Sequence, residues 1–175
     1  MRNLYFHLFA LLTMLVSCNE TQQSFEENQP FDTVFRTEIY HPGDYDSKNY
    51  RIPAIITAKD GSLVIATDKR KNNEGDLPED IDILINRSTD GGRTWSEPVV
   101  LAQGAGFEHG FGDCALVQTN GEGGLMAAFV GGKGLWASTP ENTNHSYIAS
   151  SYDNGLTWSE PQDVTALIFG AECAD

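Results

Sequence analysis

Two arginines stand at the outer ends of a predicted hairpin in the stretch YRIPAIITAKDGSLVIATDKR. Arg51 begins the first apolar strand, Arg70 ends the second, and an Asp-Gly turn separates the strands. A guanidinium is planar, always charged and able to form bidentate hydrogen bonds with a carboxylate. Arg51 could therefore bind an anionic ligand, or it could be a surface charge or an ion-pair partner. Because Lys69 and Lys71 flank Arg70, plain surface charge is the alternative at that position.

An acidic segment, EGDLPEDID at residues 74–82, follows the hairpin and holds five carboxylates in nine residues. A carboxyl group can act as a general acid or base, whereas acids in a loop are also simply solvated. Gly75 and Pro78 suit a turn that projects the side chain of Asp76. Asp80 and Asp82 are alternatives, although Asp82 falls in the strand that follows.

The elements that must position these residues are short β-type runs of apolar residues separated by Gly-containing turn signals. Helical periodicity is weak throughout, so the pattern predicts an all-β fold of antiparallel hairpins. The predicted strands are Arg51–Ala58, Ser62–Thr67, Ile81–Arg87, Asp113–Thr119, Leu125–Val130 and Ser146–Ser150.

An internal repeat with the pattern S-x-D-x-G-x-T-W occurs at residues 88–95 and 151–158, and both copies are followed by Ser-Glu-Pro. The aspartate can accept hydrogen bonds from turn amides, the glycine supplies positive φ, and the tryptophan can pack under the turn. The copies start 151 − 88 = 63 residues apart, which suggests successive blades of a propeller. The repeated residues are Ser88, Asp90, Gly92 and Trp95, then Ser151, Asp153, Gly155 and Trp158.

Both copies of this repeat resemble the Asp-box of sialidases, and Tyr50-Arg51-Ile52-Pro53 resembles the F/Y-R-I-P motif near the start of the sialidase catalytic domain. The resemblance covers roughly residues 33–175. It implies a six-bladed β-propeller with its active site at the centre, of which residues 31–175 are the N-terminal portion, ending after about two blades.

The resemblance also implies roles for individual residues. Arg51 matches one of three arginines that clamp the substrate carboxylate, and Arg70 matches an arginine that holds the acid/base aspartate or the sugar. The family pattern between Arg70 and Ser88 places the acid/base aspartate at Asp76. Asp113, at the entry to an apolar strand, matches an aspartate near the substrate's 4-hydroxyl or N-acetyl group. Capping of the strand start is the structural alternative for Asp113.

The activity implied is that of an exo-sialidase, which hydrolyses terminal α-linked sialic acids from glycoproteins, glycolipids and oligosaccharides. The family's nucleophile is a tyrosine assisted by a glutamate. We expect both, and the other two clamp arginines, beyond residue 175, because Tyr50, Tyr147 and Tyr152 lack the expected context. The chain alone is then expected to be inactive. The alternative is a non-catalytic Asp-box propeller that binds glycans or proteins.

The chain is acidic, with 11 Lys and Arg against 25 Asp and Glu and a formal net charge of -14. Long-range repulsion therefore argues against nucleic acid or an anionic membrane surface as a partner. No metal or organic cofactor is expected, because no plausible cluster of His or Cys ligands is present. His109 and Trp136 are weaker candidates: the first could titrate near neutrality, and the second could stack on a sugar or pack in the core.

The N-terminus is predicted to be an export signal at residues 1–17, because its apolar run is too short to span a membrane. Its ending resembles a lipoprotein lipobox, which implies a lipid on Cys18, a flexible tether at residues 18–30 and a membrane-anchored protein in the periplasm or at the cell surface. An ordinary signal with secretion is the alternative. Cys114 and Cys173 could form a disulfide or stay as separate buried thiols.

Overall fold

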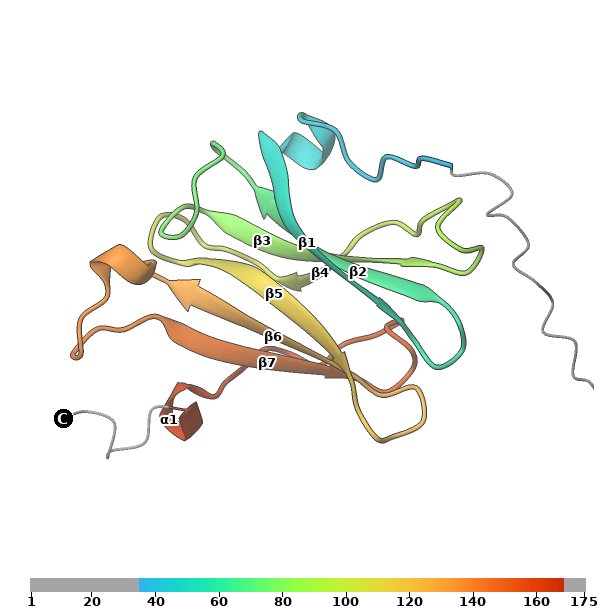
Figure 1. The fold of residues 1–175 in the computed structure, drawn as a ribbon. Coiled ribbons are helices and arrows are strands. Elements are labelled where there is room, and N and C mark those ends of the chain that lie inside the picture. The colour runs from blue at the N-terminus through green and yellow to red at the C-terminus, as the bar shows by residue number, and fades with distance from the viewer. Residues whose placement is uncertain (1–34, 169–175) are drawn as a thin grey trace, which may run out of the picture. The chain divides into compact units, whose positions relative to one another are not determined.

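The computed structural model describes residues 35–168 of the 175-residue chain. In this part, antiparallel strands form two four-stranded sheets, with the orders β1-β2-β3-β4 and β5-β6-β7-β8 (Figure 1). The all-β prediction is therefore confirmed. The predicted signal peptide, the tether, Cys18 and Cys173 lie outside the described residues. The strands are β1 (Asn49–Thr57), β2 (Leu63–Arg70), β3 (Ile81–Ser88), β4 (Val99–Ala102), β5 (Gly110–Gln118), β6 (Leu125–Gly132), β7 (His145–Ser151) and β8 (Gln162–Asp163).

Each of the six predicted strands matches an observed strand to within a few residues, and β4 and β8 are additional. These two outer strands are short, at four and two residues, so their sequences carry little alternation. Short helices complete the described chain: η1 (Asp44–Asp46), η2 (Leu135–Ala137) and α1 (Thr165–Ile168). No helix within residues 35–168 is long and apolar enough to cross a membrane.

The two sheets pack against each other through β5, which contacts β1, β2 and β3 (Figure 1). Buried apolar side chains from both sheets form one core, because each sheet must remove one face from water. In β6 the burial alternates along the strand, as expected for side chains that point to opposite faces. Core members include Val64, Ile83, Ile85, Ala127 and Phe129.

The first strand of each sheet carries a bulge at the corresponding place. The pairing of β1 with β2 shifts between Arg51 and Ala54, and that of β5 with β6 shifts between Gly112 and Ala115. The backbone φ within these bulges is positive, at 52° for Ile52 and 57° for Asp113. Because a non-glycine residue rarely adopts positive φ, the shared geometry indicates that both sheets follow one plan.

The repeated turns join β3 to β4 and β7 to β8, and their hydrogen bonds correspond. Asp90 Oδ1 accepts from the Thr94 backbone N–H at 2.9 Å, and Asp153 Oδ1 accepts from the Thr157 N–H at 2.9 Å. These bonds favour the charged carboxylates and hold the pKa of both aspartates below the ordinary value, although burial opposes the effect most strongly at Asp153. The first turn follows Ser88, which pairs with Leu63 and so lies at the opposite end of its sheet from Arg70.

Candidate active site

Arg51 and Arg70 lie at one end of the first sheet because β1 and β2 are antiparallel. In the register, Arg70 pairs with Asn49, and Arg51 pairs with Asp68. The segment between β2 and β3 folds back over this end and brings in Asp76. Asp76 Oδ1 lies 2.6 Å from Arg70 Nη1 and 3.6 Å from Arg51 Nη1. The structure thus brings together three residues that the sequence proposed for one site.

Arg70 also holds the backbone that carries Asp76. Its Nη1 donates to the carbonyl oxygens of Glu74, at 2.8 Å, and Gly75, at 2.6 Å. Arg51 Nη1 donates to the Glu74 oxygen at 3.1 Å. Only 1% of the Arg70 side chain is exposed, so its interpretation as a plain surface charge is wrong. A buried guanidinium needs such acceptors, and meeting that need positions the segment.

The inner residues of the cluster are buried, and its outer residues are exposed to solvent. Arg70 and Asp68 are almost fully buried, whereas 47% of the Arg51 side chain and 70% of the Asp76 side chain are exposed. An exposed ion pair contributes little to stability, so little free energy opposes its replacement by another contact. Arg51 can therefore bind an external carboxylate, and Asp76 can reach an external oxygen.

Asp68 is the member of the cluster that sequence reasoning missed. Its Oδ2 lies 3.2 Å from Arg70 Nη2, and its Oδ1 has no hydrogen-bond partner among the described residues. Burial raises the pKa of Asp68 to about 7, the Arg70 charge opposes this effect, and the nearby Asp113 charge adds to it. A detectable signal was present: an acid that directly follows the apolar run of a predicted strand, two residues before Arg70.

The rival acids lie in a different network. Lys71 Nζ lies 3.0 Å from Asp80 Oδ1 and 2.8 Å from Asp82 Oδ1. Asp82 is buried, and its Oδ1 also accepts from the Gly104 backbone N–H at 2.8 Å. Both acids therefore help to attach the segment around Gly104, after β4, to the first sheet. Asp76 is the acid that lies beside the two arginines.

Asp113 reaches the cluster from the second sheet. It is exposed, and it lies at the bulge inside β5 rather than at the strand start, which is Gly110. The charge of Asp113 contributes to the raised pKa of Asp68, so Asp113 lies near the buried part of the cluster. The neighbouring Gly112 permits this approach, because a Cβ there would lie 3.1 Å from Asp68 Oδ2.

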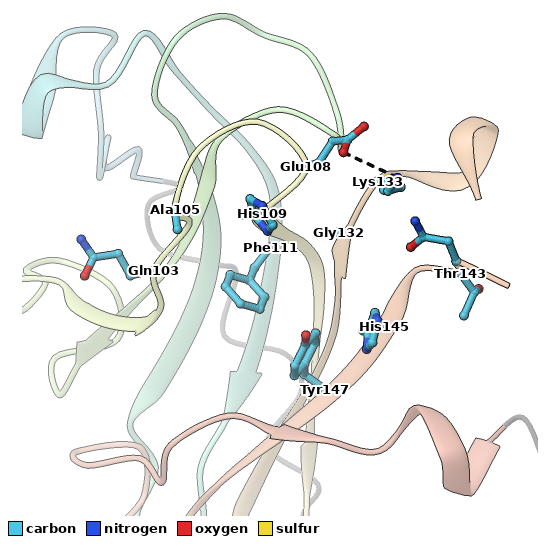
Figure 2. Close-up of a pocket in the computed structure, with 12 residues that line it drawn as sticks. Gln103, Ala105, Glu108, His109, Phe111, Gly132, Lys133, Thr143, His145 and Tyr147 are labelled. Atoms are coloured by element: carbon cyan, nitrogen blue, oxygen red, sulfur yellow. Dashed lines mark ion pairs between the residues drawn. The ribbon is translucent and has the colours of Figure 1, made fainter. Parts of the chain in front are cut away.

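The other candidates are also placed by the structure. Trp136 is 96% exposed, so the alternative that it packs in the core is wrong. Cys114 is a buried thiol, and burial raises its pKa to about 12. In residues 35–168, no group of three or more His, Cys, Asp or Glu side chains is arranged to hold a metal ion. His109 lines a cavity together with Phe111 and Tyr147 (Figure 2).

Comparison with known proteins gives a consistent family. Residues 61–171 match the BNR repeat-like domain. The chain is 35% identical over 147 residues to a sialidase of Bacteroides fragilis, covering 74% of this chain and 27% of that protein. It is 36% identical over 130 residues to a sialidase of Micromonospora viridifaciens, covering 69% and 20%. The chain thus spans about a quarter of the length of these relatives.

Solved structures agree in fold. The Hadza microbial sialidase Hz136 superposes with a TM-score of 0.59 at 35% identity, covering 71% of this chain and 28% of that one. A leech intramolecular trans-sialidase gives a TM-score of 0.63 at 16% identity, covering 78% and 38%. The second likeness bears on the fold alone.

Proposed function

The chain belongs to the BNR repeat-like domain family, and on that basis we propose that it forms part of an exo-sialidase that removes terminal α-linked sialic acids from glycoconjugates. Relatives of about 35% identity carry the name sialidase, which supports a glycoside hydrolase. The activity is proposed for the whole protein, because the chain spans only about a quarter of those relatives. We also propose that the two sheets are two blades of a six-bladed propeller; their equal strand order supports this.

The observation that carries the proposal is the meeting of Arg51, Arg70 and Asp76 at one sheet end. Arg51, charged and exposed, binds the carboxylate of the sialic acid. Asp76 protonates the departing glycosidic oxygen and then activates water. Arg70 binds Asp76 and its backbone, and Asp113 takes the 4-hydroxyl or N-acetyl group of the sugar. The weak 3.6 Å contact between Arg51 and Asp76 is the one that a substrate carboxylate replaces.

A test of Asp76 compares two leaving groups in the whole protein. Loss of general acid catalysis costs about 10²–10⁴-fold. In Asp76→Ala that loss in kcat/KM should appear in full on a sialyl-galactose linkage, whose alkoxide leaves poorly. An aryl sialoside, whose phenolate leaves easily, should be nearly spared.

The matched control is Asp80→Ala, which removes an acid four residues away that pairs with Lys71. Its kcat/KM on the two substrates should fall together or not at all. Equal losses on the two substrates in Asp76→Ala would show that Asp76 is not the general acid. If the protein binds sialylated glycans but hydrolyses neither substrate, the non-catalytic propeller is the correct function.

Arg51→Ala tests the carboxylate contact. Because this contact is made in both ground and transition states, the variant should raise KM and lower kcat/KM by roughly 1.5–3 kcal/mol, the range for hydrogen bonds to charged groups. Unchanged KM for a sialoside would contradict the assignment.

We further propose that Cys18 carries a lipid and anchors an exported protein to a membrane. The support is the short apolar run that ends in Leu15-Val16-Ser17-Cys18. Metabolic labelling with a fatty acid should label the parent and not Cys18→Ser. A Cys18→Ser form that is processed and partitions into detergent like the parent would overturn this.

A further inference from the structure

Asp68 is a buried acid that the proposed reaction leaves without a role. Only 1% of its side chain is exposed, and it lies on β2 after the fully buried apolar residues Val64 and Ala66. Its counterpart in the second sheet is Val130, so the plan common to both sheets does not require an acid at this position. Because a buried carboxylate is costly to fold, its presence indicates a role in the site.

Asp68 holds one end of the Arg70 guanidinium. Its Oδ2 lies 3.2 Å from Arg70 Nη2, and Arg70 Nε has no hydrogen-bond partner among the described residues. At the other end, Nη1 donates to the Glu74 and Gly75 oxygens and lies 2.6 Å from Asp76 Oδ1. Because a guanidinium is planar and rigid, the contact that holds Nη2 also sets the direction of Nη1. The placement of Asp76 therefore depends on an acceptor at residue 68.

The surroundings prevent another group from taking over this contact. The side chains of Asp68 and Arg70 are each 1% exposed, so bulk water cannot replace the carboxylate as the acceptor for Nη2. A Cβ on Gly112 would lie 3.1 Å from Asp68 Oδ2, which shows that β5 passes directly over the carboxylate. Asp68 Oδ2 is thus confined between β5 and the guanidinium.

The charge on Asp68 changes close to neutrality. Burial raises the pKa of this carboxyl to about 7, so Asp68 carries a proton at pH 5 and is mostly ionised at pH 8. An ionised acceptor forms the stronger hydrogen bond with a guanidinium. The register partner on β3 is the apolar Ile83. The charged or titratable groups that face Asp68 are Arg70 on its own strand, its register partner Arg51 on β1, and Asp113 and Cys114 on β5.

We propose that Asp68 is a positioning residue: its carboxylate orients the Arg70 guanidinium, which in turn holds Asp76 where it can protonate the glycosidic oxygen. The proposal deepens the proposed function and rests on it for the role of Asp76. Asp68 is buried and acts only through the arginine. Its hold on Arg70 strengthens as pH rises through 7.

The test measures kcat/KM of the whole protein on a sialyl-galactose linkage and on an aryl sialoside, and divides the first value by the second. A misplaced acid lowers this selectivity ratio, because only the galactose linkage needs a proton on its leaving group. A loss of folded protein lowers both values together and leaves the ratio unchanged. Asp68→Asn is the variant, since it keeps an acceptor oxygen, removes a buried charge and should therefore fold.

At pH 8, Asp68→Asn should lower the selectivity ratio about tenfold, less than the 10²–10⁴-fold loss from removing a general acid. At pH 5, the protonated carboxyl resembles the amide, so the parent and the variant should agree within about twofold. An unchanged ratio at pH 8, or a fall of the same size at pH 5, would overturn the proposal.

Asp82→Asn is the matched control. Asp82 is also a buried acid, and its Oδ1 lies 2.8 Å from Lys71 Nζ, outside the arginine cluster. This variant should leave the selectivity ratio unchanged at both pH values. A fall equal to that of Asp68→Asn would mean that any buried acid of the first sheet has the same effect, and would overturn the positioning role.

A double-mutant cycle tests whether Asp68 acts through Arg70. Arg70→Lys keeps a positive charge but loses the planar fork, so it should lower the selectivity ratio by itself. Adding Asp68→Asn should then lower the ratio by less than about twofold more, because the group that Asp68 orients is already gone. Two losses that multiply independently would overturn the proposal.

Asp76→Ala separates this proposal from the proposed function. A lower selectivity ratio in Asp76→Ala, with none in Asp68→Asn at pH 8, would keep the general acid and remove the role of Asp68. An unchanged ratio in Asp76→Ala would remove the general acid, and the positioning role of Asp68 with it.

Discussion

The two sheets share a plan but differ at the end where the candidate active site lies. Strand order, the bulge in the first strand and the aspartate turn correspond in both. In the first sheet, the register pairs Arg51 with Asp68 at the bulge, and Arg70 follows two residues later. The corresponding positions of the second sheet are Gly112, Val130 and Gly132. The same scaffold therefore carries charged side chains at these positions in one sheet, and two glycines and a valine in the other.

The difference teaches that the two ends are complementary. The glycines of β5 make room for the charged end of the first sheet. A Cβ on Gly110 would lie 2.1 Å from the Glu79 oxygen, and one on Gly112 would lie 3.1 Å from Asp68 Oδ2. The acidic segment and the Asp68–Arg70 pair can thus pack against β5 because positions 110 and 112 of that strand carry no side chain.

The largest expected effect on stability comes from removing Arg70, a buried charge that has no counterpart in the second sheet. Arg70→Ala should reduce the free energy of unfolding by roughly 3–5 kcal/mol, because Asp68 is left buried without its ion-pair partner. Arg51→Ala, at the exposed rim, should cost less than about 1 kcal/mol. Urea denaturation of both variants measures the difference. Equal losses in the free energy of unfolding would mean that the buried Asp68–Arg70 pair is no more important to stability than the exposed Arg51.

A pH effect should follow from Asp68 and be absent at its counterpart, Val130. Burial raises the folded-state pKa of Asp68 from the model-compound value of 3.8 to about 7. Between those values the folded state binds more protons than the unfolded state, so stability should fall as pH rises through this window. The stability lost between pH 5 and pH 8 through this group should be roughly 2–4 kcal/mol.

Asp68→Asn should remove that dependence, whereas Asp80→Asn should retain it. Chemical denaturation at pH 5 and pH 8 gives the comparison. An unchanged pH slope in Asp68→Asn would contradict the raised pKa of this group.

Gly110→Ala tests whether β5 must lack a side chain at the position that faces the acidic segment. The added methyl group meets a backbone oxygen that cannot move aside alone, so the variant should lose about 1–3 kcal/mol of stability. Gly121→Ala is the matched control, because a Cβ there has nothing within 4 Å. Comparable thermal denaturation midpoints for the two variants would contradict the inference that the two sheet ends are complementary.

The smallest expected effect on stability concerns the aspartate turn, which both sheets share. Asp90→Ala and Asp153→Ala each remove the hydrogen bonds that close a turn, and each should lower Tm by only a few degrees. The two losses should be similar because the turns correspond. Calorimetry of the two variants measures both, and a loss several times larger in one sheet would show that the turns are not equivalent.

The sequence by itself determined the elements of this protein and much of its candidate site. Alternating apolar runs and glycine turns are local signals, so six strands and the repeated turn could be read directly. Arg51, Arg70 and Asp76 could be named as candidates because their types and spacing resemble a family pattern, and the structure then brings their side chains together. Short β4 and β8 escaped, since two to four residues carry too little periodicity.

Only the tertiary structure decided which of these residues are buried. Three lysines and arginines in a row at residues 69–71 look alike in sequence, yet Arg70 is enclosed and Lys71 binds the rival acids. Asp68 became part of the site because β5 covers it, and the cavity lined by His109 and His145 formed because the segment after β4 lies close to β7. Burial depends on which surfaces pack together, and residues distant in sequence supply those surfaces.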